Sequence, residues 1–115
     1  MVMQKSLLLE LADKLTKEIY RKTFDFPFKF QSSLGDQLRR ASLSIPLNIT
    51  EGNSRKSDRE EHQFLRIAFS SLKETKYLMY FAREFDLISE KTHLQLFDIS
   101  ETLAKLLYGI LYKKV

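Results

Sequence analysis

The sequence predicts an all-α protein, an antiparallel up-and-down four-helix bundle that forms a single domain over residues 1–115. Three observations lead to this prediction. Only three glycines and two prolines interrupt the 115 residues. Hydrophobic residues make up 43% of the chain and recur every three or four positions through four long stretches, which is the period of an α-helix. No stretch alternates hydrophobic and polar residues as a β-strand does.

A first helix is expected over residues 4–23. One face carries hydrophobic residues three or four positions apart: Leu8, Leu11, Leu15 and Ile19. The other face carries acids four positions before a base, an arrangement that stabilises a helix. These pairs are Glu10 with Lys14, Asp13 with Lys17, and Glu18 with Lys22. The next segment contains Phe24, Phe26 and Phe28, and we expect all three rings to pack onto the end of the bundle.

A second helix is expected to begin at Ser32 or Ser33, because either serine can cap a helix start. Pro46 lies within its hydrophobic stripe. Proline lacks a backbone N–H, and its ring clashes with the carbonyl four residues earlier, here that of Ser42. We therefore expect this helix to be kinked at Pro46, and Gly52 to end it.

The third and fourth helices are expected to begin at Ser57, which opens a capping box with Glu60, and at Ser89. Each of these helices carries two adjacent hydrophobic stripes, more than a lone bundle requires. The excess either thickens the core or forms a surface through which copies of the chain associate. The candidate residues for such an oligomer interface are Leu65, Leu72, Phe97, Leu107 and Leu111.

The sequence favours no catalytic, metal or cofactor chemistry. Cysteine is absent, which excludes thiol catalysis and thiolate-bound metals. The two histidines, His62 and His93, have no partner at metal-ligand spacing, and no phosphate-binding loop is present. No hydrophobic run is long enough to span a membrane, and Glu10 interrupts the only run that resembles a signal peptide. We expect a soluble, cytoplasmic protein that is not an enzyme.

Basic residues gather at the expected turn between the second and third helices. The chain carries a net charge of +4, and Arg55, Lys56 and Arg59 fall within five residues of one another. Arginine binds phosphate through two parallel hydrogen bonds, so these residues, with Arg39 and Arg40, are candidates for binding nucleic acid. A solvated turn with no ligand is the alternative interpretation.

The segment before that turn combines unusual residues within one helix: Ser44, Pro46, Asn48, Glu51 and Gly52. A structural interpretation is that Asn48 fills the hydrogen-bond gap left by Pro46, or bonds to a neighbouring helix and fixes its register. A functional interpretation makes the same polar groups a recognition surface.

Several segments resemble the 23S rRNA intervening-sequence-encoded four-helix bundle family. The resemblance covers nearly the whole chain in order, at residues 26–27, 34–41, 44–52, 64–68 and 71–74. Its most specific part is Ser44-Ile45-Pro46, followed by Asn48-Ile49 and Glu51-Gly52. The sequence departs from the family pattern at Thr50, where alanine is usual, and at Ser70, where glycine is usual.

The resemblance implies an antiparallel bundle that assembles into a homopentameric ring, and it implies no enzymatic activity; we also expect no cofactor. It also implies a link to RNA, because family members are encoded within insertions in bacterial large-subunit rRNA genes. A related branch, the accessory protein of diversity-generating retroelements, binds nucleic acid and a reverse transcriptase. Two functions remain open: an oligomeric RNA-binding accessory protein, or a scaffold that binds a protein partner and no nucleic acid.

Overall fold

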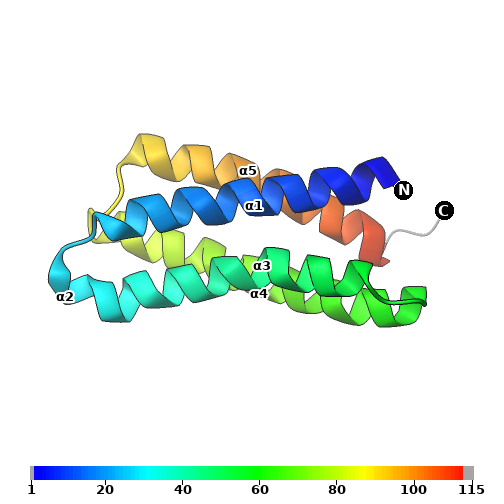
Figure 1. The fold of residues 1–115 in the computed structure, drawn as a ribbon. Coiled ribbons are helices and arrows are strands. Elements are labelled where there is room, and N and C mark those ends of the chain that lie inside the picture. Colours follow the sequence, from blue (N-terminus) through cyan, green and yellow to red (C-terminus); the bar gives the residue numbers. More distant parts are fainter. Residues whose placement is uncertain (1, 113–115) are drawn as a thin grey trace.

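The structure, a computed structural model, describes residues 2–112, and these fold into four long helices and a short helical segment (Figure 1). In chain order the elements are α1 (Val2–Phe24), α2 (Phe28–Phe30), the π-helical turn η1 (Gln31–Gly35), α3 (Asp36–Asn53), α4 (Asp58–Glu84) and α5 (Glu90–Tyr112). No strand occurs among the described residues. The predicted all-α fold is confirmed.

Successive long helices are antiparallel and form a closed four-membered bundle of 44 × 24 × 18 Å. α3 packs between α1 and α4, and α5 packs between α4 and α1. The α3–α4 turn lies at the same end of the bundle as the start of α1, on the right in Figure 1. The α4–α5 turn and α2 lie at the opposite end. No helix within residues 2–112 combines the length and the apolar character that crossing a membrane requires.

Three of the five residues predicted for an oligomer interface lie in the core of the single chain instead. Leu65, Leu72 and Leu107 are at most 1% exposed within the single chain, so they have no surface with which to contact a second copy. Both hydrophobic stripes of α4 are buried because this helix contacts α3 on one side and α5 on the other. The excess apolar residues at these positions therefore thicken the core.

The helix starts confirm two of the predicted caps. The Ser57 hydroxyl accepts a hydrogen bond from the Glu60 backbone N–H at 3.2 Å, and the Ser89 hydroxyl accepts one from that of Thr92 at 3.0 Å. The predicted cap at Ser32 or Ser33 is wrong. Helical backbone already begins at Phe28 and passes through η1 into α3, so neither serine stands at a helix start.

The expectation for the phenylalanine-rich connection is right for only one ring. Phe26 is buried, whereas Phe24 and Phe28 are 64% and 93% exposed. Gln31 holds this connection instead, since its side-chain amide donates to the carbonyls of Thr23 and Phe26 at 2.9 and 2.8 Å. These bonds satisfy backbone acceptors at the end of α1 and in the connection that follows it.

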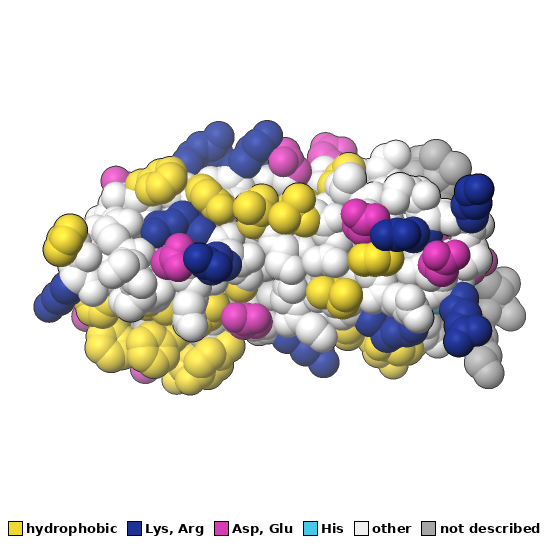
Figure 2. Space-filling view, turned by 60° about the horizontal axis from the view of Figure 1, so that its bottom comes forward, with side chains coloured by type: hydrophobic (Ala, Val, Ile, Leu, Met, Phe, Trp, Pro, Cys, Tyr) yellow, Lys and Arg dark blue, Asp and Glu magenta, His cyan; other side chains and the backbone are white. Residues whose placement is uncertain are grey.

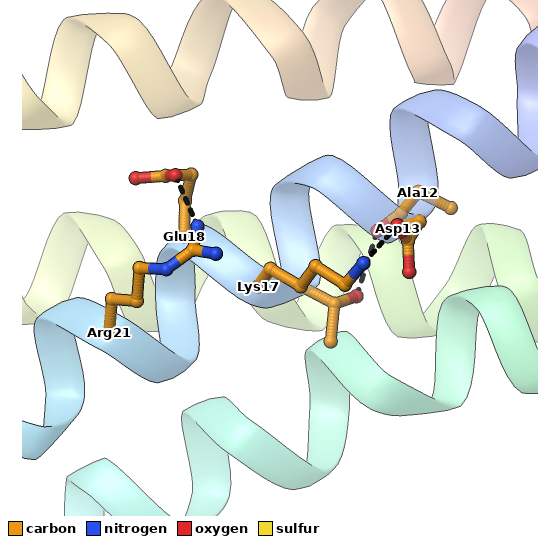
Figure 3. Close-up of polar contacts among 6 residues, drawn as sticks. Ala12, Asp13, Lys17, Glu18 and Arg21 are labelled. Atoms are coloured by element: carbon orange, nitrogen blue, oxygen red, sulfur yellow. Dashed lines mark hydrogen bonds and ion pairs between the residues drawn. The ribbon is translucent and has the colours of Figure 1, made fainter.

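The charged face of α1 forms one of the predicted pairs and one pair that was not predicted. The expected pair of Asp13 and Lys17 is present, with 2.8 Å between Nζ and Oδ2. Glu18, however, pairs with Arg21 at 2.7 Å and not with Lys22, as Figure 3 shows. The i,i+3 spacing also places side chains on one helix face, so both arrangements were compatible with the sequence.

Candidate functional site

The unusual α3 segment is tied to α1 at Pro46. Proline has no N–H to donate to the Ser42 carbonyl, which would otherwise be its helical partner. The hydroxyl of Thr16 on α1 lies 2.9 Å from this carbonyl oxygen and 2.8 Å from the carbonyl of Ala12. Thr16 therefore fills the gap left by Pro46, which was one of the interpretations considered for Asn48. α3 continues as one helix through Pro46, and the bend expected there stays a prediction.

Asn48 bonds to Ser44, which in turn links α3 to α4. Its side-chain amide donates to the carbonyl and the hydroxyl of Ser44, at 2.8 and 3.0 Å. The Ser44 hydroxyl lies 2.8 Å from that of Ser71 on α4. Asn48 therefore bonds within α3, and the bond to the neighbouring helix is made by Ser44.

Gly52 allows α3 and α4 to approach closely before the turn. A Cβ atom at this position would lie 3.2 Å from the carbonyl oxygen of Glu61 and 3.3 Å from the Cβ of Phe64. Such contacts are tighter than ordinary van der Waals distances, so a side chain would push the helices apart. Glu51 forms an ion pair with Arg55 on the same helix end. The residues of this segment thus mainly make contacts within the fold.

The five predicted nucleic-acid-binding residues do not form one surface. Arg39 and Arg40 lie near the start of α3, whereas Arg55, Lys56 and Arg59 lie at the α3–α4 turn. Sixteen residues of helical rise separate Arg39 from Arg55, which corresponds to about 24 Å. The two groups therefore belong to opposite ends of the bundle (Figure 1).

The arginines near the start of α3 are engaged within the chain. Arg39 donates to the backbone carbonyl of Gln31 at 2.9 Å and lies over the Phe24 ring, 5.5 Å from its centroid. Arg40 forms an ion pair with Asp36 at 2.9 Å. Arg39 therefore supports the π-helical turn, and its donors are directed inward.

The basic residues at the α3–α4 turn are more accessible. Arg55 pairs with Glu51 and lies 4.6 Å from the Phe64 ring centroid. Lys56 and Arg59 are exposed, and neither lies within ion-pair distance of a carboxylate among residues 2–112. Figure 2 shows lysine and arginine side chains at this end, on the right of the face formed by α3 and α4.

Two further basic residues extend this surface and were missed in the sequence analysis. Arg66 and Lys73 follow Arg59 at intervals of seven residues, which places all three on one face of α4. The stripe is about 21 Å long at the rise of an α-helix. The seven-residue spacing is visible in the sequence. It becomes informative only when α4 is known to continue unbroken from Asp58 to Glu84.

An aromatic region lies at the other end of α4, on the left in Figure 2. Its rings belong to α2, to α4 and to the residue that follows α4, and each lies beside at least one other: Phe30, Tyr77, Tyr80, Phe81 and Phe85. Phe81 and Phe85 are stacked, with centroids 4.8 Å apart. Of the predicted interface residues, Phe97 is 39% exposed and Leu111 is partly buried. Exposed apolar surface therefore exists on α4 and α5.

Within residues 2–112, the structure places no three histidine, aspartate or glutamate side chains where they could hold a metal ion together. His62 and His93 lie on different helices, α4 and α5. Ser42 is buried and donates to the carbonyl of Arg39 at 3.2 Å, and Ser44 contacts Ser71. Both serines are thus engaged in helix contacts.

Comparison with known families identifies the chain's relatives. The model of the 23S rRNA-intervening sequence protein family matches residues 4–109. The chain belongs to this family. This confirms the resemblance inferred from the segments around Pro46 and Gly52. No curated protein matches the chain.

A solved structure confirms the fold of this family member. It is a crystal structure from Bacteroides thetaiotaomicron, described as a protein with unknown function from the S23 ribosomal protein family. The two proteins are 20% identical, and the match covers 94% of this chain and 97% of the other with a TM-score of 0.82. At this identity the likeness establishes the shared bundle alone.

Proposed function

We propose that this family member is a non-catalytic, oligomeric accessory protein that binds structured RNA through the α3–α4 turn. The observation that carries the proposal is the pair of exposed cations there, Lys56 and Arg59, which have no carboxylate partner among the described residues. A cation without a carboxylate partner does not have to break an ion pair within the protein before it binds a phosphate. The full free-energy gain from counterion release is therefore available. Arg66 and Lys73 extend the same charge along α4.

Self-association would increase this binding. In a homopentameric ring the turn is repeated around the particle, so modest contacts in each copy add through multivalency. With Leu65, Leu72 and Leu107 in the core, the contacts between copies fall to exposed apolar residues, including Phe97 and the aromatic region of α4. A protein scaffold without RNA binding is the second candidate, and the same aromatic region favours it.

Charge-removing variants test the proposal directly. Arg55, Lys56 and Arg59 are replaced together by glutamine, and binding to a hairpin RNA is measured by electrophoretic shift. Since all three residues are exposed, the triple variant should keep the melting temperature and the molar mass of the wild type while losing most RNA binding.

The matched control removes the same number of charges from α1, by replacing Lys14, Lys17 and Lys22 with glutamine. These residues lie on the half of α1 that is remote from the α3–α4 turn, so this variant should retain most binding. Equal losses in both variants would show that only net charge matters. Absence of binding by the wild-type protein would favour the scaffold.

A further inference from the structure

Three aromatic rings form a cluster on the face between α4 and α5, apart from the aromatic region near α2. The Phe69 ring centroid lies 6.5 Å from that of Tyr108 and 6.3 Å from that of Tyr112, and the two tyrosine rings are 5.1 Å apart. Tyr108 and Tyr112 are 56% and 48% exposed. About half of each tyrosine surface is thus open to solvent, although the rings are held together.

Cations surround this cluster. The Lys73 ammonium lies 4.9 Å from the Phe69 ring centroid, and Arg66 and Lys105 precede Phe69 and Tyr108 by three residues on their helices. None of these three cations lies within ion-pair distance of a carboxylate among residues 2–112.

The acid at this face is already neutralised. Glu101 lines the same face, but its carboxylate pairs with Lys76 at 2.7 Å. The sequence contains no other acid at 62–73 or 102–112, the stretches that carry the rings and the free cations. The face therefore carries an excess of positive charge beside exposed aromatic rings.

A hollow of about 560 Å³ opens beside the rings of Phe69 and Tyr108, and two small residues, Ala104 and Gly109, help to line it. A Cβ atom placed on Gly109 would meet nothing within 4 Å. The fold of the single chain therefore does not require glycine here, although glycine inside a helix is about 1 kcal/mol less favourable than alanine. The missing side chain leaves space for something outside the chain.

We propose that this hollow binds unpaired bases of a single-stranded nucleic acid, which stack on Tyr108 and Tyr112 while Arg66, Lys73 and Lys105 hold the phosphates. Exposed aromatic rings beside a cationic groove are the features that bind single strands without strong sequence preference. The inference extends the proposed function, because Arg59, Arg66 and Lys73 connect the α3–α4 turn with the hollow. A strand that leaves a structured RNA at the turn reaches the hollow along this stripe.

A second copy that met this face with its own identical face would fit less well, and in a cyclic pentamer neighbouring copies meet through different faces. Two copies that meet through the same face would bring Lys73 and Lys105 of each toward those of the other, and like charges at such contacts are unfavourable. A polyanion with planar bases complements the positive charge of this face and can stack on its aromatic rings. Binding of a second copy of the chain at this face is one of the outcomes that the test distinguishes.

The test compares two RNA probes, a short unstructured oligoadenylate and a hairpin RNA. Gly109→Leu fills the hollow, and Gly109→Ala is its matched control because it adds only a methyl group. We expect Gly109→Leu and Tyr108→Ala to weaken oligoadenylate binding about tenfold or more. Hairpin binding should change less than twofold, and Gly109→Ala should behave as the wild type for both probes.

Tyrosine fluorescence gives a second measurement, because the chain contains five tyrosines and no tryptophan. Oligoadenylate should quench this emission in the wild type and less in the Tyr108→Ala, Tyr112→Ala double variant. Replacing Tyr77, in the other aromatic region, should leave the quenching by stacked bases largely intact. A DNA oligonucleotide of the same sequence shows whether the hollow distinguishes the two sugars.

The outcomes separate this inference from the proposed function. If Gly109→Leu and Tyr108→Ala leave oligoadenylate affinity unchanged and hairpin binding is normal, the inference about the hollow is overturned. The proposal that the α3–α4 turn binds RNA is then unaffected. Loss of hairpin binding alone in the α3–α4 turn variant, with oligoadenylate still bound at the hollow, supports both sites. A fall in molar mass on Gly109→Leu substitution assigns the face to a second copy and overturns the inference, as does a wild type that binds no oligoadenylate.

Discussion

The hydroxyl of Thr16 on α1 lies 2.9 Å from the backbone carbonyl oxygen of Ser42 on α3. Pro46 cannot donate a hydrogen bond to this carbonyl because proline has no backbone N–H. Thr16 and Ser42 are buried, at 5% and 0% exposure. A proline in the middle of a helix thus creates an acceptor for a neighbouring helix. This contact couples the most distinctive segment of the sequence to α1.

A double-variant cycle tests this coupling. Thr16→Val keeps the shape of the side chain but leaves the Ser42 carbonyl without a donor, which should lower the free energy of unfolding by about 1–3 kcal/mol. Pro46→Ala restores the missing N–H. It should therefore stabilise the Thr16→Val protein by about 1 kcal/mol more than it stabilises the wild type, as measured by denaturant unfolding. Strictly additive effects would show that Thr16 and Pro46 are independent.

Removal of the Asn48 amide should have a smaller effect. Asn48→Leu leaves the Ser44 hydroxyl in contact with Ser71, so no buried group loses its last partner. We expect a loss of about 0.5–1.5 kcal/mol in a thermal or denaturant melt. Ser71→Ala should cost a similar amount because it breaks the same connection between α3 and α4. A loss above about 3 kcal/mol for Asn48→Leu would place Asn48 in a role beyond this contact.

Substitutions in the second stripe of α4 should unfold the chain. Leu72 is fully buried, so Leu72→Ala should lower stability by about 2–5 kcal/mol. Leu72→Glu places an unpaired charge in the core and should abolish the helical circular dichroism signal. Retention of full helicity by Leu72→Glu, with a fall in molar mass, would return this residue to an interface between copies.

The sequence predicted the helices better than it predicted their surfaces. Helix period and the serines at positions 57 and 89 identified α4 and α5, because these signals are local. The partners of Gln31 and Arg39 could not be predicted, since they depend on a π-helical turn that follows no hydrophobic period. The burial of Leu65 and Leu107 could not be predicted either, because the width of a hydrophobic stripe does not reveal how many helices pack against it.

The candidate site was predicted in part for the same reason. The cluster of Arg55, Lys56 and Arg59 is local in sequence and stays together at the α3–α4 turn. Arg39 and Arg40 were grouped with it by charge alone, and the helical rise of α3 separates them from it. Which cations remain unpaired depends on side-chain partners such as Glu51, and these become visible only in the folded chain.

Oligomeric state is a separate prediction. Light scattering after gel filtration should give a mass five times that of the 13.6 kDa chain. The prediction rests on the exposed apolar residues of α4 and α5, which suit a contact between copies. Tyr77→Glu combined with Phe81→Glu should reduce the mass while helicity is retained, because both rings are exposed. A single-chain mass for the wild type would contradict the prediction.

The salt dependence of RNA binding tests the central claim most directly. The association constant of the wild-type protein with a hairpin RNA is measured over a range of salt concentrations, and the slope of its logarithm against that of salt reports the number of phosphates contacted. We expect a steep negative slope that becomes shallower by about one for each phosphate-contacting cation removed from Arg55, Lys56 and Arg59. A slope that these substitutions leave unchanged, or the absence of measurable binding at low salt, would contradict the assignment of RNA binding to the α3–α4 turn.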